Sequence, residues 1–370
     1  MRVTLLAPRN DLTGNRKLVT MFARELGRRH AVRIAYPVIQ DRAFHAHRHR
    51  PLRGIRYAAE CLRDMTDYLA HPRWRYASLA GEGSVQVTAY WHAIPAVMLE
   101  QTDVVVYSSV YQALELDAIP HGRAVRVFYV MHEQSRTDAH VVEPALTQQT
   151  YCRADHVIAL SQETSQHVSE LGVTPEAVIP AGVDTARFHP NETVSSSPTP
   201  TLLGYYWPAE PRKGAGQLLA ALDQVRRRHP DLAIQLLTHK GGRVQGYPAC
   251  HELSEQKLAE LYRRSAIFVY PSVAGGGFAL PPLEAMASGC GVVAAPVGAI
   301  GEYLRHDISG ILCDTRSVEQ LAAQIERLIQ QPDLLARIRQ QAVSDAQAWS
   351  WARAAEQLDA YLQQVARGAR

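Results

Sequence analysis

The residues best suited to chemistry lie between positions 274 and 293, where a glycine run leads into a short helix. The run is Gly275–Gly277, two prolines follow it, and the helix carries Glu284. Glycine lets a backbone come close to a ligand, and proline in the first turn of a helix costs no hydrogen bond. Free N–H groups and the positive end of the helix dipole then point to one place, which suits a phosphate. Because Glu284 lies one turn further on, where it can accept hydrogen bonds from a sugar hydroxyl, these residues predict a site for a sugar diphosphate.

The same stretch resembles the donor-binding loop of the retaining nucleotide-sugar glycosyltransferases of the group 1 family, which have the two-domain GT-B fold. Members typically read Glu-Gly-Phe-Gly-Leu-Pro-Pro-Leu-Glu-Ala-Met-Ala-x-Gly, followed by a Val-Val strand. Aligned on Phe278, this chain keeps the family residue at Gly277, Leu280, Pro281, Pro282, Leu283, Glu284, Ala285, Met286, Ala287 and Gly289. The first glutamate of the family pattern falls on Gly276, and its next glycine falls on Ala279.

This resemblance implies a role for each part of the loop. In the family the second glutamate binds the ribose of the donor, so Glu284 is expected there. The first glutamate touches the donor sugar, so Gly276 marks a departure at the sugar end of the site. The donor-binding residues expected in this loop are Gly276, Gly277, Phe278, Ala279, Leu280 and Glu284.

A donor diphosphate also needs positive charge near its leaving oxygens, and Arg212-Lys213-Gly214 supplies it between a strand and a helix. The family pattern there is Gly-Arg-x-x-x-x-Lys-Gly, with both basic residues on the phosphates. Lys213 matches by the glycine after it. The arginine has no counterpart beside Gly204, and Arg212 is the candidate to replace it. We expect Arg212 and Lys213 to be catalytic; the alternative is an exposed basic pair before a helix.

Two residues of the N-terminal half are further candidates. His132 follows the expected strand Val125–Val130, and many family members have a histidine there that reaches the donor sugar or the acceptor. We expect His132 to be catalytic, with a helix cap or a bond to a backbone carbonyl as the alternative. Gly14 lies where the glycine loop of the family faces the diphosphate or the acceptor, so it is a donor-binding candidate. A plain turn before a helix is the alternative for Gly14.

No metal and no cofactor are expected. The chain has no Asp-x-Asp, the pair with which glycosyltransferases of the other large fold hold a divalent ion. The alternating histidines His45, His47 and His49 have a spacing that could bind a metal, but the arginine between them and the basic surroundings oppose a cation. We therefore expect the departing phosphate to be stabilised by basic side chains and backbone amides.

The elements that would position these residues follow from alternating apolar runs and helical patterns. This alternation predicts an α/β protein with two doubly wound Rossmann-like domains, each with a parallel sheet between layers of helices. The expected strands are Val3–Ala7, Val32–Tyr36, Val104–Tyr107, Val125–Val130, His156–Leu160, Leu202–Tyr206, Ala233–Thr238, Ile267–Tyr270 and Val292–Ala295. The expected helices include Leu18–Arg29, Ala215–Arg228 and Ser254–Arg264.

The boundary between the domains is visible in the composition. The passage from Ile179 to Pro190 resembles the segment between the two domains of the family, and a Ser-, Thr- and Pro-rich stretch follows it. We predict an N-terminal acceptor domain at residues 1–190, a linker at 191–200 and a nucleotide-sugar domain at 201–349. By resemblance, the helix at 350–370 crosses back to the N-terminal domain.

Size and composition exclude several classes of protein. The 370 residues have a net charge of +3, too small to imply nucleic acid, and no run of 18 apolar residues. The N-terminus is better explained as a first strand than as a signal peptide. The five cysteines form no close pair, which favours reduced thiols and a cytoplasmic location.

The segment 42–76 is unusually basic, with eight arginines and four histidines against three acidic residues. A solvated helical face explains it most simply. A surface for anionic lipid head groups, which would hold the protein at the inner face of a membrane, is a second explanation, and an acidic glycan acceptor is a third.

Taken together, these patterns favour a retaining, metal-independent glycosyltransferase. It would move a sugar from a nucleoside diphosphate sugar to a hydroxyl of a glycan or lipid-linked acceptor, in the synthesis of cell-surface polysaccharide. Gly276 and the absent arginine keep a catalytically degenerate binding or scaffolding protein open as the alternative. A sugar-nucleotide epimerase or a phosphorylase of the same architecture is a further one.

Overall fold

A computed structural model gives the fold of the chain. The structure describes residues 1–7, 14–38, 85–91, 93–120, 122–132, 143–191, 200–238, 242–244, 246–251, 253–275 and 277–368. The chain forms two compact units, one made of Met1–Pro180 with Ala354–Arg370 and the other of Ala181–Arg353.

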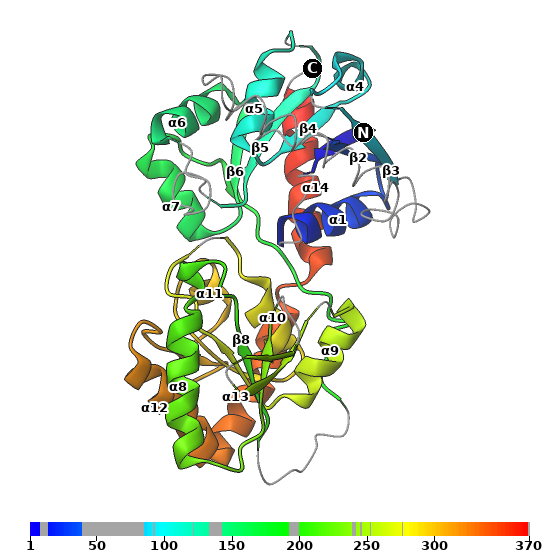
Figure 1. Ribbon diagram of the computed structural model, residues 1–370. Helices are drawn as coiled ribbons and strands as arrows, with labels where there is room; N and C mark the ends of the chain where they lie inside the picture. The colour runs from blue at the N-terminus through cyan, green and yellow to red at the C-terminus, as the bar shows by residue number, and fades with distance from the viewer. Residues whose placement is uncertain are drawn as a thin grey trace. The chain divides into compact units, whose positions relative to one another are not determined.

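The first unit is a parallel seven-stranded sheet, and in the described residues a helix connects each pair of successive strands apart from the second and third, whose connection lies outside the described residues (Figure 1). Its strands are β1 (Arg2–Leu6), β2 (Ala31–Pro37), β3 (Val85–Tyr90), β4 (Val104–Tyr107), β5 (Val125–Val130), β6 (His156–Ala159) and β7 (Ala177–Val178). Its helices are α1 (Gly14–Leu26), α4 (Ala96–Glu100), α5 (Val110–Asp117), α6 (Pro144–Arg153), α7 (Gln162–Glu170) and most of α14 (Trp351–Gly368). The strand order is β3-β2-β1-β4-β5-β6-β7, so the sheet extends from β1 in both directions.

The second unit repeats this plan. Its strands are β8 (Leu202–Tyr205), β9 (Ile234–Leu237), β10 (Gly242–Val244), β11 (Tyr247–Cys250), β12 (Ile267–Tyr270), β13 (Gly291–Ala294) and β14 (Ile311–Leu312). Its helices are the 3₁₀ turn η3 (Pro211–Lys213), α8 (Ala215–Arg228), α9 (Glu255–Arg264), α10 (Leu280–Ala287), α11 (Ile300–Tyr303), α12 (Val318–Gln330) and α13 (Pro332–Gln347). The order is β10-β11-β9-β8-β12-β13-β14, and only the pair β10 and β11 is antiparallel among the described strands.

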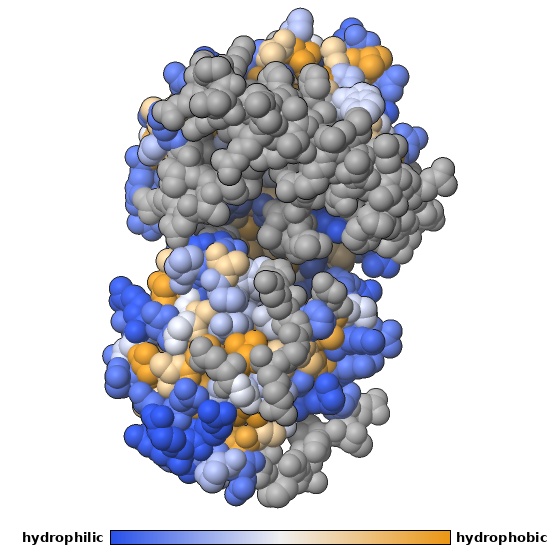
Figure 2. Space-filling model, in the orientation of Figure 1, coloured by the Kyte–Doolittle hydropathy of each residue, from blue (hydrophilic) through white to orange (hydrophobic). Residues whose placement is uncertain are grey.

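The strand sequences explain why both sheets are covered on two faces. Every residue of β4 (Val-Val-Val-Tyr) and of β13 (Gly-Val-Val-Ala) is buried, as expected for strands between two layers of helices. The covering helices are amphipathic. In α12, Leu321, Ile325 and Leu328 lie on one face and are fully buried. Figure 2 shows the opposite character at the C-terminal end of α8, where the last turn carries three arginines and the surface is hydrophilic.

The fold class expected from the sequence is confirmed, since both units have parallel sheets with alternating helices. The structure corrects the start of the first helix, which begins at Gly14 and not at Leu18. Its first turn is polar, so the apolar pattern that marks a helix in the sequence begins only in the second turn. In the described ranges, no helix has the length and apolar character needed to cross a bilayer.

The last helix, α14, belongs to the first unit from Ala354 onward and lies alongside α1 in Figure 1. His30 Nε2, just after α1, lies 2.6 Å from Oδ1 of Asp359. Further along α14, the Tyr361 hydroxyl donates a hydrogen bond of 2.9 Å to Glu176. Leu358 and Leu362 are fully buried between these polar contacts, so both apolar and ionic interactions hold the helix in place.

Candidate functional site

The strand order of the second unit identifies where a ligand is expected. The chain passes from β8 to β9 on one side and later returns to β12 on the other side of β8. Such a point, where strand order reverses, opens a crevice at the carboxyl ends of the two strands, and open α/β sheets bind ligands there. The segments that leave these two ends are the turn with Arg212 and Lys213 and the loop that precedes Glu284. The topology therefore brings the main sequence candidates to one edge of the sheet.

The turn after β8 carries both basic candidates in η3. The Lys213 N–H donates to the carbonyl of Glu210, which fixes the turn. The Arg212 guanidinium lies 2.5 Å from a carboxylate oxygen of Glu210, and the Trp207 indole donates to the other oxygen at 3.2 Å. Arg212 thus forms an ion pair with Glu210, and this pair reduces the positive charge that Arg212 offers to an anionic ligand.

Lys213 points to the neighbouring strand end. Its ammonium donates a hydrogen bond of 3.0 Å to the hydroxyl of Tyr270, the last residue of β12. The same ammonium lies 5.5 Å from the centre of the Tyr270 ring, within the range of a cation–π contact. The positive charge of Lys213 is therefore held at the carboxyl ends of β8 and β12.

The two loops that leave β8 and β12 are locked together. Gly214 has φ +65°, and a Cβ there would lie 2.1 Å from the carbonyl oxygen of Pro271, so only glycine fits. The Val273 N–H donates to the Arg212 carbonyl at 2.8 Å, and the Ser272 hydroxyl donates to the same carbonyl at 3.2 Å. These contacts fix the position of the basic turn relative to the second loop.

Aromatic rings cover the strand ends below this turn. The Tyr205 ring lies 5.0 Å from that of Tyr270 and stacks on Trp207 at 5.7 Å with an angle of 6°. Burial raises the pKa of Tyr205 well above its ordinary value, and the charges of Glu210 and Glu284 raise it further. The Tyr205 phenol is therefore neutral at physiological pH and can serve only as a neutral hydrogen-bonding group.

The glycine loop after β12 ends in two residues with left-handed backbone. Gly277 has φ +99° and Ala279, the residue before α10, has φ +60°. Pro281 and Pro282 have no N–H, and the Leu283 N–H makes the first bond inside the helix, so the start of α10 offers a ligand only the N–H groups of Ala279 and Leu280. Gly276 lies outside the described residues.

Phe278 anchors this loop and does not face solvent. Its side chain is 3% exposed, and its ring lies 5.5 Å from Tyr303 and 5.8 Å from Trp349. The Tyr303 hydroxyl donates to the Ala279 carbonyl at 2.8 Å. Phe278 therefore contributes to a ligand site through its backbone only, and its side chain holds the loop in place.

Glu284 lies in the second turn of α10 and is 4% exposed. Burial raises the pKa of Tyr262 well above its ordinary value, and the Glu284 carboxylate is the largest further cause. The same carboxylate acts on Tyr303 in the same direction. The charge of Glu284 therefore acts on the phenols of Tyr262 and Tyr303, and protein atoms cover almost all of its surface.

The first unit contains the other two sequence candidates. His132 follows β5 by two residues and is partly buried, whereas Gly14 is the first residue of α1 and not part of a preceding turn. The basic segment 42–76, with the histidines at 45, 47 and 49, lies outside the described residues. Among the residues that the structure describes, no three His, Cys, Asp or Glu side chains are grouped so that they could hold a metal ion.

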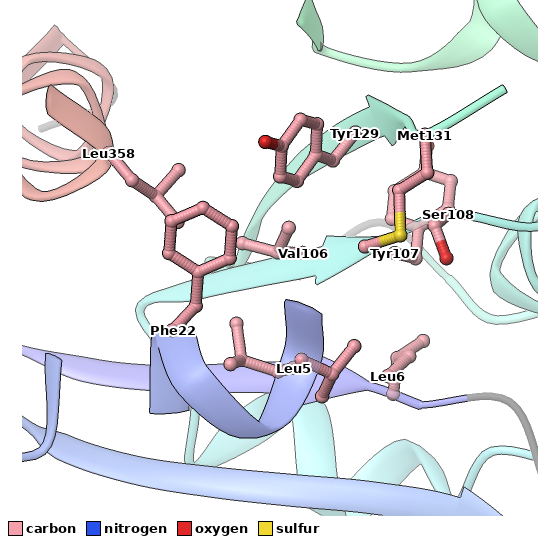
Figure 3. Close-up of a pocket in the computed structure, with 10 residues that line it drawn as sticks. Leu5, Leu6, Phe22, Val106, Tyr107, Ser108, Tyr129, Met131 and Leu358 are labelled. Carbon is pink, nitrogen blue, oxygen red and sulfur yellow. The ribbon is translucent and has the colours of Figure 1, made fainter. Parts of the chain in front are cut away.

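A small apolar cavity lies at the carboxyl ends of β1, β4 and β5 in the first unit (Figure 3). Phe22 from α1 and Leu358 from α14 converge on it, with Tyr129 and Met131 from the end of β5. Its volume of about 10 Å³ admits at most one water molecule. It is a packing gap between helices and sheet, and it does not accommodate a substrate.

Comparison with known proteins follows the same division into two units. A model described as "Glycosyltransferase Family 4" matches residues 14–187, and a model described as "Glycosyl transferases group 1" matches residues 250–345. A D-inositol 3-phosphate glycosyltransferase of Rhodococcus jostii is 26% identical over 65% of this chain and 60% of its own length. An MMP alpha-(1->4)-mannosyltransferase of Mycolicibacterium hassiacum is 31% identical over 56% of this chain and 53% of its own. The chain thus spans less than two thirds of the length of these curated relatives.

Solved structures agree on the fold. Alr3699/HepE of Anabaena, determined in complex with UDP and glucose, superposes with a TM-score of 0.73 over 98% of this chain and 100% of its own, at 16% identity. Sucrose-phosphate synthase of Thermosynechococcus elongatus gives a TM-score of 0.70 over 98% of both chains, at 14% identity. The fold is therefore that of the GT-B glycosyltransferases. The two family models match 14–187 and 250–345, so the chain is similar to glycosyltransferases of family 4 in its first part and of group 1 in its second part.

Some features of the site were not anticipated from the sequence. The pairing of Lys213 with Tyr270 joins residues 57 positions apart, and no local pattern indicates it. Tyr205 occupies the position beside Gly204, where the family pattern has its arginine, and its stacking on Trp207 is likewise a product of the fold. The ion pair of Arg212 with Glu210 could have been predicted from the sequence, because an acidic residue two positions before an arginine in a tight turn indicates a local ion pair.

Proposed function

We propose that this chain transfers a sugar from a nucleoside diphosphate sugar to a hydroxyl of a glycan or lipid-linked acceptor, in the synthesis of cell-surface polysaccharide. The observation that carries the proposal is the position of Lys213 between the carboxyl ends of β8 and β12. The glycine loop and Glu284 follow β12 at the same edge of the sheet. Together they offer a cation, backbone N–H groups and a carboxylate, which match a diphosphate and a ribose.

The proposed chemistry uses these groups as fixed charges. When the bond to the sugar breaks, negative charge develops on the departing phosphate oxygen. Lys213, Arg212 and the amides of residues 276–280 would stabilise it, and one such donor is commonly worth about 2.7–4 kcal/mol. In this proposal the reaction needs no divalent metal and retains the anomeric configuration, as the family resemblance implies. His132 of the first unit is the proposed catalytic group for the sugar or the acceptor.

The donor and acceptor are proposed at the level of chemical class. A fold relative was solved with UDP and glucose, which makes UDP-sugars the first donors to test. Two curated relatives are named D-inositol 3-phosphate glycosyltransferase and MMP alpha-(1->4)-mannosyltransferase, which makes these two compounds the first acceptors to test. We place the protein in the cytoplasm at the inner face of the membrane, with residues 42–76 as the proposed contact to lipid. No nucleic acid partner is proposed.

A second candidate function is a binding or scaffolding protein that keeps the fold without turnover. Two observations favour it: Tyr205 occupies the position of the family arginine, and Arg212 is paired with Glu210. Both lower the positive charge available to a diphosphate. A protein of this kind would either bind a nucleotide sugar without cleaving it or bind no nucleotide sugar at all. In both cases it would release no nucleotide.

A thermal-shift panel of UDP, GDP, ADP and their sugars in the presence of EDTA tests the donor site. A ligand at 100 times its dissociation constant adds about 2.7 kcal/mol to stability, which gives a clear shift. We expect one nucleotide to stabilise the wild type and to lose its effect in Glu284→Ala. Because Glu284 is buried, Glu326→Gln, a buried glutamate of α12 in the same unit, serves as the control that keeps the shift. No shift from any nucleotide would contradict the proposed function.

A further inference from the structure

The proposed function leaves open how a single flexible lysine is held in place for the diphosphate. A lysine side chain has four rotatable bonds and a large rotamer entropy, so an unrestrained ammonium must be ordered when it binds an anion. In this structure the ammonium of Lys213 is already ordered by Tyr270, at 3.0 Å from the hydroxyl and 5.5 Å from the ring centre. An ammonium only donates hydrogen bonds, so the phenol oxygen is the acceptor.

Tyr270 is suited to be a fixed anchor. It is the last residue of β12, is 2% exposed, and its ring packs against Tyr205 at 5.0 Å. The strand backbone pairs with β8 on one side and β13 on the other, which fixes the base of the side chain. The hydroxyl of Tyr270 therefore has a defined position. The hydrogen bond to this hydroxyl defines the position of the Lys213 ammonium as well.

The elements that carry the two residues cannot move apart independently. The carbonyl of Arg212 accepts hydrogen bonds from the Val273 N–H and the Ser272 hydroxyl. Gly214 packs so closely on Pro271 that a methyl group would not fit between them. The distance between the start of the Lys213 side chain and the Tyr270 ring is thus set by backbone contacts.

We infer that Tyr270 is a positioning residue for Lys213, which it holds in the orientation that meets the donor diphosphate. This inference rests on the proposed function, because it names how the cation of the same site is set. The positioning of Lys213 is important in this site because Arg212 is paired with Glu210, so the positive charge for the diphosphate comes mainly from Lys213.

A double-mutant cycle tests the inference. Dissociation constants for UDP and GDP are measured by isothermal titration calorimetry on wild type, Tyr270→Phe, Lys213→Ala and the double variant. Phenylalanine keeps the ring that contacts Tyr205 and removes only the hydroxyl. We expect Tyr270→Phe to weaken binding about threefold to thirtyfold, the range set by the entropy of a lysine side chain. In the Lys213→Ala background, the same substitution should change binding less than about twofold, because no ammonium is left to position.

A structural role would give a different pattern. If Tyr270→Phe weakens binding equally with and without Lys213, the residue acts on the ligand or on the fold, and the inference is overturned. The inference is also overturned if Tyr270→Phe binds the nucleotide as tightly as the wild type does and only Lys213→Ala binds it more weakly. In that case the proposed function still stands. If the wild type binds neither UDP nor GDP, the donor proposal in this form and the inference fail together. The control is Tyr361→Phe, which removes a hydroxyl bonded to Glu176 at 2.9 Å in the first unit and should leave binding unchanged.

Discussion

At the scale of single residues, Ala279 shows most clearly how this chain departs from the family pattern that it resembles. It has φ +60° and ψ +71°, a left-handed conformation that costs a residue with a Cβ about 1–2 kcal/mol. The family pattern has glycine at this position, which adopts the conformation without strain. The strain is maintained by neighbours, because the Tyr303 hydroxyl donates to the Ala279 carbonyl and Phe278 is buried beside it.

Replacing Ala279 with glycine should therefore stabilise the second unit. Relief of strain gains about 1–2 kcal/mol, and the greater freedom of glycine in the unfolded chain costs about 0.5–1 kcal/mol. The expected net gain is about 0.5–1 kcal/mol, seen as a higher midpoint in urea unfolding followed by tryptophan fluorescence. A lower midpoint would show that the Ala279 methyl group makes contacts that outweigh the strain.

The residue scale also shows what sequence reasoning can and cannot reach in the site. Glu284 and Lys213 were singled out because glycine and proline beside them mark a loop and a helix start, which are local signals. The roles of Tyr205 and Tyr270 depend on two strands being neighbours, and 57 positions separate Tyr270 from Lys213. In the sequence, Tyr205 and Tyr270 indicate only strands, because tyrosine has a high β-propensity.

At the scale of elements, most of the strands that the sequence predicted are apolar along most of their length. β12 and β4 are of this kind, and their bounds are as expected. β3 alternates apolar and polar residues at an edge of its sheet, and β11 contains Pro248, a residue that argues against a strand. β3 was missed because an edge strand buries less and gives a weaker signal, and β11 was missed because of its proline.

The connection between η3 and α8 provides a matched test of the locked loops. Gly214→Ala would place a Cβ 2.1 Å from the Pro271 carbonyl oxygen at φ +65°, so we expect a loss of about 3 kcal/mol or more. Gly216→Ala lies two residues further, inside α8, where nothing lies within 4 Å of the new Cβ. It should stabilise the helix by up to about 1 kcal/mol. Urea unfolding of the two variants gives the comparison, and equal effects would contradict the close packing of Gly214 on Pro271.

The docking of α14 in the first unit gives a pH-dependent prediction. Burial by itself raises the pKa of Asp359, but hydrogen bonds from Gln363, His30 and Arg29 outweigh it, so the pKa lies below its ordinary value. A carboxyl with a lowered pKa stabilises the fold above its unfolded pKa, near 3.9, and loses this contribution as the pH falls through the folded pKa.

Asp359→Asn should therefore weaken the attachment of α14 at neutral pH by about 1.5–3 kcal/mol, the usual value of hydrogen bonds to a charged group. Hydrogen exchange of the α14 amides measures this local opening directly. The difference between wild type and variant should begin to shrink below about pH 4, where Asp359 of the opened form becomes protonated, and should disappear as the pH falls through the lowered pKa of the folded form. A difference that stays constant with pH would show that the charge of Asp359 does not contribute.

At the scale of the whole molecule, the two units share one topology, with strand order reversing beside their first strands β1 and β8. In the second unit, Lys213, the glycine loop and Glu284 lie in the segments that follow the carboxyl ends of β8 and β12, where the strand order reverses. In the first unit a small apolar cavity of about 10 Å³ lies at the corresponding strand ends, lined by residues that include Phe22, Tyr129 and Leu358. The charged groups at the strand ends of the second unit support the proposal that this unit binds the donor.

The most direct test of the proposed transfer is the release of nucleotide from a panel of UDP- and GDP-sugars, with and without glycan or lipid-linked acceptors. The wild type should release nucleotide slowly from one donor by hydrolysis and faster when a suitable acceptor is added. Lys213→Ala should reduce this release about 100-fold or more, because a preorganised charge at the departing phosphate is lost. Release at the wild-type rate in Lys213→Ala, or binding of a nucleotide sugar without any release by the wild type, would contradict the account.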